Sequence, residues 1–294
     1  MTDQKIGRTG IMGGSGLYDI KGIEVIDSLS IETPFGKPSD DLLLARIGEH
    51  EVVFMPRHGR GHQIPPHKIN YRANVYAMKL AGVKRIISIS AVGSLREDIP
   101  PGDFVLVDQF VDQTHSPHSR ESTFFDGPVV AHVSMADPVC SCLKADLSAA
   151  CKHAGFDAHE GGNYLVMQGP QFSSRAESNL YRSWGMDVIG MTNMPEAKLA
   201  REAEICYATV AMSTDYDCWH EDEEDVSVEA IIEIMQANVA RAQKMLQSFF
   251  TSGSSIATCT CGCQQALEKG IFADLKTQDD DAIRPIHALV ERFL

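Results

Sequence analysis

Apolar segments rich in β-branched residues alternate along the chain with segments in which apolar residues recur at helical spacing. Residues 205–212 are apolar on both faces, as expected for a strand that helices cover on both sides of a sheet. Residues 69–82 have helical spacing and end in a glycine, and residues 226–248 form an amphipathic helix. This alternation predicts an α/β protein in which helices flank a central sheet.

Three predicted strands end in small or polar residues that suit an anion. The first leads into GGSG at residues 13–16, the hairpin of residues 42–55 leads into PRHGRGH, and the strand at residues 85–90 leads into AVGSL. Glycines let backbone amides approach an anion closely, and Arg can donate two parallel hydrogen bonds to a phosphate or carboxylate. A plain tight turn explains the first segment equally well, because it lacks the Gly-Lys-Ser/Thr ending of a P-loop.

The net charge limits the classes of partner. The 294 residues carry a formal net charge of −14, which argues against nucleic acid or a membrane surface as a partner. A local cluster must therefore hold any anionic substrate, and the segment with Arg57 and His58 is the candidate. His58, His62 and His67 lack the i, i+4 spacing of a helical metal site, so we expect anion binding there and not a metal. The sequence shows neither an export signal nor an apolar run of membrane length, so we expect a cytoplasmic protein.

Eight cysteines without an export signal indicate thiols and not a disulfide framework. Three of them lie among apolar residues, as packed free thiols do. The other five form two sets, Cys140 with Cys142, and Cys259 with Cys261 and Cys263. For the second set we rank exposed free thiols first, a strained redox-active disulfide second and a metal-binding tail third, because C-x-C-x-C is not the usual zinc spacing.

Two acidic residues, Asp215 and Asp217, follow the buried strand of residues 205–212. Ligands bind at the carboxyl ends of strands in α/β sheets, so we expect Asp215 to be functional. Asp217 is alternatively a helix cap or a loop acid. At another strand end, Phe172 is expected either in the core or stacked on a flat ring, and Ser173 is expected to cap the following helix.

Six motifs occur in order along residues 8–250, namely GGSGL, PRHGRGH with PPHKINYRAN, SAVGSLR, QGPQFSSRAE, GMTNMPE and STDYDCW. With these motifs the chain resembles the methylthioadenosine phosphorylase branch of the trimeric purine nucleoside phosphorylase family. The resemblance implies a single α/β domain over residues 1–294, with a central mixed sheet that is distorted towards a barrel and flanked by helices. It is best over residues 8–250, and residues 251–294 are a cysteine-containing extension. It also implies a homotrimer, or a hexamer built as a dimer of trimers.

The resemblance further implies one continuous pocket for phosphate, sugar and base. The implied phosphate-binding residues are Ser15, Arg57, His58, Ser90, Ala91 and Thr192. Met191 would lie against the ribose, Phe172 and Ser173 beside the purine, and Asp215 and Asp217 at its N7 and 6-amino edge. The implied pocket for the 5′ group contains Val228, Ile231, Ile232 and, from across the subunit interface, His132. Core packing is the alternative role for the first three of these residues.

The implied reaction is phosphorolysis of 5′-methylthioadenosine to adenine and 5-methylthioribose 1-phosphate, with inorganic phosphate as co-substrate and without a cofactor or metal. Phosphate would attack C1′ and stabilise its positive charge. We expect Asp215, with a pKa raised by burial, to protonate the leaving purine at N7. Related enzymes for 6-oxopurines have Asn at this position, so Asp215 predicts selectivity for 6-aminopurines.

Alternative functions remain inside and outside this enzyme class. A phosphorylase of broader or 6-oxopurine (methylthioinosine) specificity is one alternative, and a nucleosidase that uses water is another. The anion cluster around Arg57 favours phosphorolysis over hydrolysis. A dinucleotide-binding redox protein would need a Rossmann fingerprint, which is missing. A nucleoside-binding module without catalysis would need neither the anion cluster nor Asp215.

Overall fold

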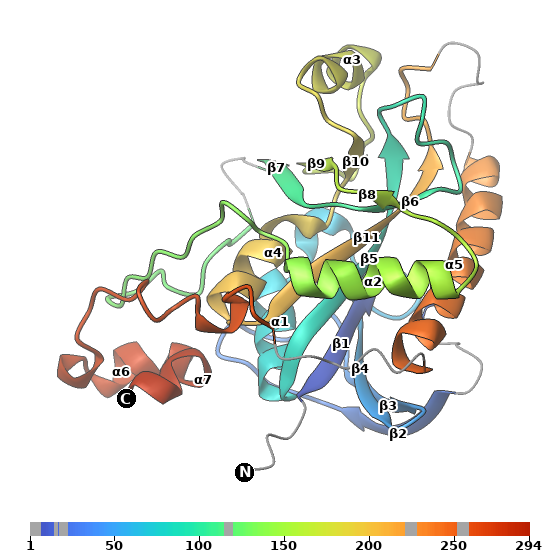
Figure 1. Ribbon diagram of the computed structural model, residues 1–294. Coiled ribbons are helices and arrows are strands. Elements are labelled where there is room, and N and C mark those ends of the chain that lie inside the picture. The colour runs from blue at the N-terminus through green and yellow to red at the C-terminus, as the bar shows by residue number, and fades with distance from the viewer. Residues whose placement is uncertain (1–6, 15–16, 18–22, 115–119, 221–227, 252–258) are drawn as a thin grey trace.

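The computed structural model describes residues 7–14, 17, 23–114, 120–220, 228–251 and 259–294 (Figure 1). The strands in chain order are β1 (Arg8–Gly13), β2 (Ile23–Leu29), β3 (Leu42–Ile47), β4 (His50–Pro56), β5 (Val83–Ser94), β6 (Phe104–Leu106), β7 (Gln109–Gln113), β8 (His159–Glu160), β9 (Asn163–Met167), β10 (Val188–Gly190) and β11 (Cys206–Asp215). The α-helices are α1 (Tyr71–Leu80), α2 (Ser141–His153), α3 (Arg175–Ser183), α4 (Asn193–Glu202), α5 (Val228–Thr251), α6 (Asp280–Ile283) and α7 (His287–Val290). Short 3₁₀ helices lie at Pro66–Lys68, Cys263–Gln265, Leu275–Thr277, Arg284–Ile286 and Glu291–Phe293.

Within these residues, eleven strands form one mixed sheet. Its main order is β2-β3-β4-β1-β5-β10-β9-β7, and β11, β6 and β8 branch from β5. β5 pairs in parallel with β1 and β11, and its last residues pair antiparallel with β10. Because different parts of β5 have different neighbours, the sheet curls around this strand, and the predicted mixed sheet flanked by helices is confirmed.

Helices cover both faces of the sheet (Figure 1). On one face α2 and α5 contribute Leu147 and Met245 to a buried apolar cluster, and on the other face α1 and α4 contribute Val75 and Leu199 to a second cluster. Side chains of the C-terminal extension, from Leu267 to Val290 in the sequence, join the second cluster. The extension therefore packs on the same core as α1 and α4.

Local patterns account for the elements that position the site. β11 is buried from its first residue to its ninth, which agrees with its prediction as a strand covered on both faces. The predicted hairpin is confirmed, because β3 and β4 are antiparallel around Gly48, whose φ is +59°. The predicted strand at residues 85–90 is too short, since pairing with β11 extends β5 beyond it. Ser90 and Ala91 consequently lie inside a strand and not in a turn.

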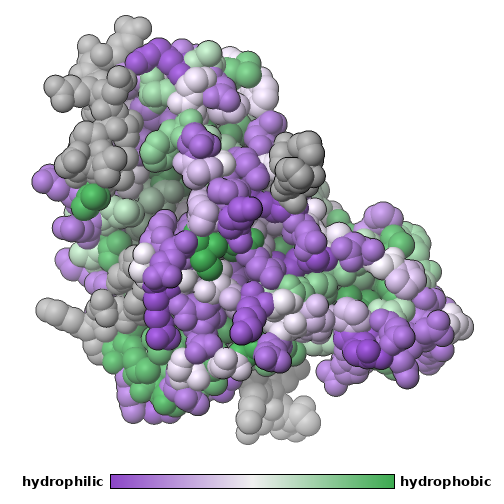
Figure 2. Space-filling model, turned by 180° about the vertical axis from the view of Figure 1, so that it is seen from behind, coloured by the Kyte–Doolittle hydropathy of each residue, from purple (hydrophilic) through white to green (hydrophobic). Residues whose placement is uncertain are grey.

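The surface agrees with the acidic, polar composition. Hydrophilic residues predominate on the face opposite to that of Figure 1, with apolar residues scattered between them (Figure 2). The exposed apolar side chains include Val25 and Ile26 on the edge strand β2. Of the helices that the structure describes, none is long and apolar enough to cross a membrane.

Candidate functional site

Four strands bring the implied phosphate-binding segments together. The backbone amide of Arg57, directly after β4, donates to the last carbonyl of β1 at 3.0 Å. The hydroxyl of Ser90 on β5 donates at 3.2 Å to the side chain of the first residue of α4, which follows Thr192. Arg57, Ser90 and Thr192 therefore lie on neighbouring segments, and Ala91 follows Ser90 on β5. Ser15, two positions beyond the end of β1, lies outside the described residues.

Arg57 is buried and held by a fixed set of acceptors. Its Nε donates to Oε2 of Glu196 at 2.7 Å and its Nη2 to Oε1 at 3.0 Å, which is a bidentate ion pair. Nη2 also donates to Oγ of Ser88 at 2.7 Å, and backbone carbonyls of β1 and β5 accept from the same guanidinium. Burial alone would lower the pKa of Arg57, but the Glu196 carboxylate raises it above its ordinary value. The guanidinium is thus a permanent, immobile positive charge.

His58 does not add a second cation. Burial lowers its pKa to about 4, so the ring is neutral near pH 7. Its Nδ1 lies 2.8 Å from the carbonyl of Ile64, which can only accept, so Nδ1 carries the proton and Nε2 is the acceptor. Arg60 lies on the surface beside Asp40. The expected cation cluster is therefore reduced at this segment to Arg57.

The contribution of His58 to the free energy of unfolding is expected to fall as the pH drops from about 6.5 to about 4. The unfolded His58 binds a proton near pH 6.5 and the folded one near pH 4, so between these values the unfolded state binds more protons. Stability therefore rises with pH across this window. The shift corresponds to roughly 2–4 kcal/mol. Urea unfolding at a series of pH values should show this dependence in the wild type and less of it in His58→Gln; equal slopes in both proteins would contradict it.

Arg120 supplies a second buried guanidinium that the sequence analysis missed. Its Nη1 donates to the carbonyls of Met191 at 2.6 Å and Met194 at 2.7 Å and to the Tyr71 hydroxyl at 3.1 Å, and its Nη2 donates to the carbonyl of Gln168 at 2.8 Å. It thus clamps the end of β9 to the end of β10. Every acceptor that the described residues give it is a neutral oxygen, so its positive charge stays available to attract an anion nearby.

The carboxyl groups of Asp215 and Asp217 lie against β5. The chain turns between them, because Asp217 has a φ of +53°, and its amide donates to Oδ1 of Asp215 at 2.8 Å. Gly93 makes this approach possible, since a Cβ there would lie 2.9 Å from Oδ1 of Asp215 and 3.3 Å from Cβ of Asp217. Within the described part of the loop, up to residue 220, no helix begins at Asp217, which leaves its helix-cap alternative without support.

The two carboxyls differ in their surroundings. Both oxygens of Asp215 accept hydrogen bonds, Oδ1 from the Asp217 amide and Oδ2 from the Thr214 hydroxyl at 2.7 Å. Burial raises the pKa of Asp217, and its Oδ2 is buried without a hydrogen-bond partner in the described structure. A pKa raised by burial, the property expected of the proton donor, is thus present at Asp217.

The segment implied to border the purine lies next to this pair. Phe172 is 68% exposed, so it is not a core residue and its ring face is accessible. The prediction that Ser173 caps α3 is wrong, because Ser174 is the N-cap and forms a capping box with Glu177. Ser173 is tied to the aspartate loop instead, since the Cys218 thiol donates to its carbonyl at 3.2 Å.

The implied pocket for the 5′ group is not assembled by the described residues of one chain. His132 is exposed, its amide donates to the carbonyl of Gly270, and its ring packs edge-on against Phe272 in the C-terminal extension. Ile232 is 45% exposed on α5. Val228 and Ile231 belong to the same helix, but their side chains lie outside the described part of the structure.

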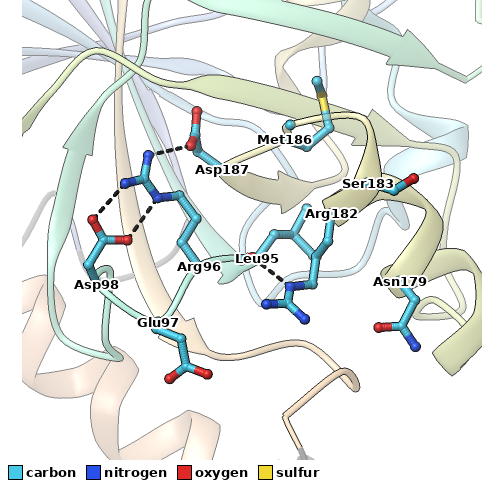
Figure 3. Close-up of a pocket in the computed structure, with 10 residues that line it drawn as sticks. Leu95, Arg96, Glu97, Asp98, Asn179, Arg182, Ser183, Met186 and Asp187 are labelled. Carbon is cyan, nitrogen blue, oxygen red and sulfur yellow. Dashed lines mark hydrogen bonds and ion pairs between the residues drawn. The ribbon is translucent and has the colours of Figure 1, made fainter.

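A cleft of about 780 Å³ lies between the end of β5 and the end of α3 (Figure 3). Arg96 forms ion pairs there with Asp98 and Asp187, and Nε of Arg182 donates to the carbonyl of Leu95. The residues that line this cleft include none of the implied site residues. The cleft is therefore distinct from the implied anion site.

Sequence reasoning left Glu196 and Arg120 without a role, and it placed Gly93 in an anion-binding turn although Gly93 lies inside β5. Glu196 and Gly93 are both part of the motifs named above. A role for Glu196 could have been inferred because a buried Arg requires a carboxylate partner. The signal for Gly93 was a glycine inside a strand, which marks close approach of another group. Arg120 had no local signal, because its acceptors come from three segments that are distant from it in the sequence.

Comparison with known proteins agrees with this architecture. A sequence model of the phosphorylase superfamily matches residues 8–251. The S-methyl-5′-thioadenosine phosphorylase of Geobacter sulfurreducens is 54% identical and aligns over 90% of this chain and 91% of its own. That of Cereibacter sphaeroides is 46% identical, with 97% and 98% covered.

Solved structures agree as well. A methylthioadenosine phosphorylase from an antarctic soil metagenomic library superposes with a TM-score of 0.90 at 42% identity, with 96% of this chain and 98% of that one covered. A mutant adenosine/methylthioadenosine phosphorylase from Schistosoma mansoni in complex with methylthioadenosine gives a TM-score of 0.77 at 33% identity, with 97% and 98% covered. The chain therefore belongs to the phosphorylase superfamily.

Proposed function

We propose that the chain is a pentosyltransferase that phosphorolyses 5′-methylthioadenosine to adenine and 5-methylthioribose 1-phosphate. The observation that carries the proposal is the spacing along β5, where Ser90 on the phosphate side and Gly93 under the aspartate pair are three residues apart. This spacing corresponds to about 10 Å along a strand, which a pentose and its base can bridge. The activity named for the relatives described above supports the same substrate.

In the proposed reaction an oxygen of phosphate bonds to C1′ while the bond from C1′ to the purine nitrogen breaks, and the bonding electrons leave with the purine. Ser90 and Thr192 donate hydroxyl hydrogen bonds to the phosphate, and Arg57 and Arg120 provide positive charge around it. Glu196 fixes Arg57 before substrate arrives, so little reorganisation is required during the reaction. The bound phosphate in turn stabilises the positive charge at C1′.

The aspartate pair takes up the charge on the purine. We propose that Asp217, whose pKa is raised by burial, holds the proton that passes to N7. A carboxylate oxygen of Asp215 accepts from the 6-amino group. This assignment exchanges the roles expected from the sequence, and it keeps the selectivity for 6-aminopurines, because an ionised carboxylate cannot donate to the oxygen of a 6-oxopurine.

We also propose that the enzyme works in the cytoplasm as a homotrimer or a hexamer built as a dimer of trimers. His132 is exposed in one chain and packs against Phe272 of the C-terminal extension, so it is accessible to a neighbouring subunit, across whose interface it would complete the pocket for the 5′ group. All eight cysteines lie in the described residues and are free, which suits a reducing compartment. Inorganic phosphate is the proposed co-substrate, without a further cofactor.

The test is cleavage of methylthioadenosine, methylthioinosine and adenosine, each with and without phosphate. We expect adenine release that depends on phosphate, yields the sugar 1-phosphate and is fastest with methylthioadenosine. Release without phosphate would identify a nucleosidase. Faster release from methylthioinosine would contradict the assignment of Asp215.

A further inference from the structure

Four cysteines that are distant in the sequence meet at the end of β11 away from the aspartate pair. Cys140 precedes α2, Cys206 is the first residue of β11, and Cys259 and Cys263 come from the C-terminal extension. Cys140, Cys206 and Cys263 are buried, and their sulfurs and that of Cys259 all lie within 4.8 Å of one another. The start of α2, the start of β11 and the C-terminal extension thus bring four sulfur atoms together.

The spacing of these sulfurs matches a tetrathiolate zinc site. With Zn–S bonds of about 2.3 Å, tetrahedral geometry places the sulfurs about 3.8 Å apart. The sulfurs of Cys140 and Cys259 are 3.6 Å apart, and the whole set lies within 4.8 Å. The sulfur of Cys261 lies 3.3 Å from that of Cys140 and 2.9 Å from that of Cys259, so an ion bound by the other four requires Cys261 to turn towards solvent.

Two features beside the four cysteines offset negative charge on their sulfurs. The amide of Leu143 in the first turn of α2 donates to the Cys140 sulfur at 3.4 Å, and the positive end of the helix dipole favours a negative sulfur there. Arg85 lies close enough to Cys140, Cys206 and Cys259 to interact with their charge. A zinc ion with four thiolates carries two negative charges, and the guanidinium of Arg85 offsets part of them.

We propose that Cys140, Cys206, Cys259 and Cys263 bind one structural Zn²⁺ per chain. Four thiols release four protons to solvent and form four Zn–S bonds, and no electrons are transferred. The donor set is closed, as in structural zinc sites, and the ion would fasten the extension to the core. On spacing alone a metal-binding tail ranked behind free thiols and a disulfide. Cys140 and Cys206 reverse that order, because they complete the ligand set that the tail lacked.

The zinc site is separate from the proposed reaction. Cys206 and Asp215 are the two ends of β11, which places them about 30 Å apart along the strand. Loss of the ion is therefore expected to lower thermal stability while leaving kcat/KM at low temperature unchanged.

The experiment uses the full chain purified with a phosphine reductant in zinc-supplemented medium, followed by metal analysis. We expect about one Zn²⁺ per chain. Replacement by Co²⁺ should give the intense visible bands of tetrahedral cobalt thiolate, saturating at one ion per chain. Removal of the ion by a chelator should lower the melting temperature.

Three variants keep the test decisive. Cys206→Ser should lose the bound metal, whereas Cys151→Ser, an equally buried thiol in the same core, should retain it. Cys261→Ser tests the choice of ligands, because the Cys261 sulfur lies 2.9 Å from that of Cys259 and 3.3 Å from those of Cys140 and Cys263. We expect this variant to retain the metal, and loss of the metal would overturn the proposed ligand set. A reduced wild-type chain with no bound zinc and no cobalt spectrum would overturn the proposal. An oxidised pair within the four cysteines of the freshly isolated chain, or metal retention by Cys206→Ser, would overturn it as well.

Discussion

Replacement of Asp215 by Asn is expected to lower kcat/KM for methylthioadenosine by about 10²–10³-fold and to affect methylthioinosine much less. The variant loses a charge-assisted hydrogen bond from the 6-amino group and presents an N–H against it, and both effects together are worth about 3–4 kcal/mol. The same N–H can donate to the oxygen of a 6-oxopurine. Base release from both substrates at saturating phosphate measures the change, and an equal loss on both would contradict the proposed contact.

Asp217→Asn is the matched comparison, because it makes the same chemical change two residues away. It should lower the rate on both substrates about 10²–10⁴-fold, since the proton donor is needed whichever base leaves. The protonated form is active and burial raises the pKa of Asp217, so the wild-type rate should fall as the pH rises through that pKa. In Asp217→Asn the rate should not fall over this pH range. If Asp215→Asn removes the fall in rate instead, Asp215 is the proton donor.

Patterns over a few neighbouring residues were enough to predict individual strands, the β3–β4 hairpin and the strand ends. The apolar run before Asp215 specified a strand buried on both faces, and glycine at the turn specified the β3–β4 hairpin. Strand ends then located Arg57 and Asp215. The N-cap of α3 was also encoded, because Glu177 stands three residues after Ser174 and not after Ser173, which is the spacing of a capping box.

The remaining features depend on contacts between distant segments. Glu196 is 139 residues from Arg57, and Cys259 is 119 residues from Cys140. No periodicity or spacing in the sequence reports such a pairing, since it follows from the order of strands in the sheet. The neutral state of His58 has the same origin, because its burial depends on the tertiary packing around the segment. Charge state and metal ligation were therefore the least predictable properties.

Replacement of Glu196 by Gln is expected to lower the free energy of unfolding by about 3–5 kcal/mol, because it leaves the charge of Arg57 buried without its counter-ion. Both side chains are almost completely inaccessible, and the Ser88 and Tyr207 hydroxyls also donate to Glu196. Urea unfolding at fixed protein concentration should show a lower midpoint with an unchanged slope. Glu51→Gln is the control, since it removes the surface ion pair with Arg8 and should cost less than about 1 kcal/mol.

Replacement of both partners separates the structural role of this ion pair from its role in phosphate binding. An Arg57→Met/Glu196→Leu variant should recover much of the stability lost in Glu196→Gln, because apolar groups of similar volume remove the uncompensated charge. It should not recover phosphate-dependent adenine release, since the fixed guanidinium beside Ser90 and Thr192 is gone. A double variant that is both stable and active would show that Arg57 only supports the fold. Arg120 would then be the cation that holds phosphate, and Arg120→Met in that background should abolish the remaining activity.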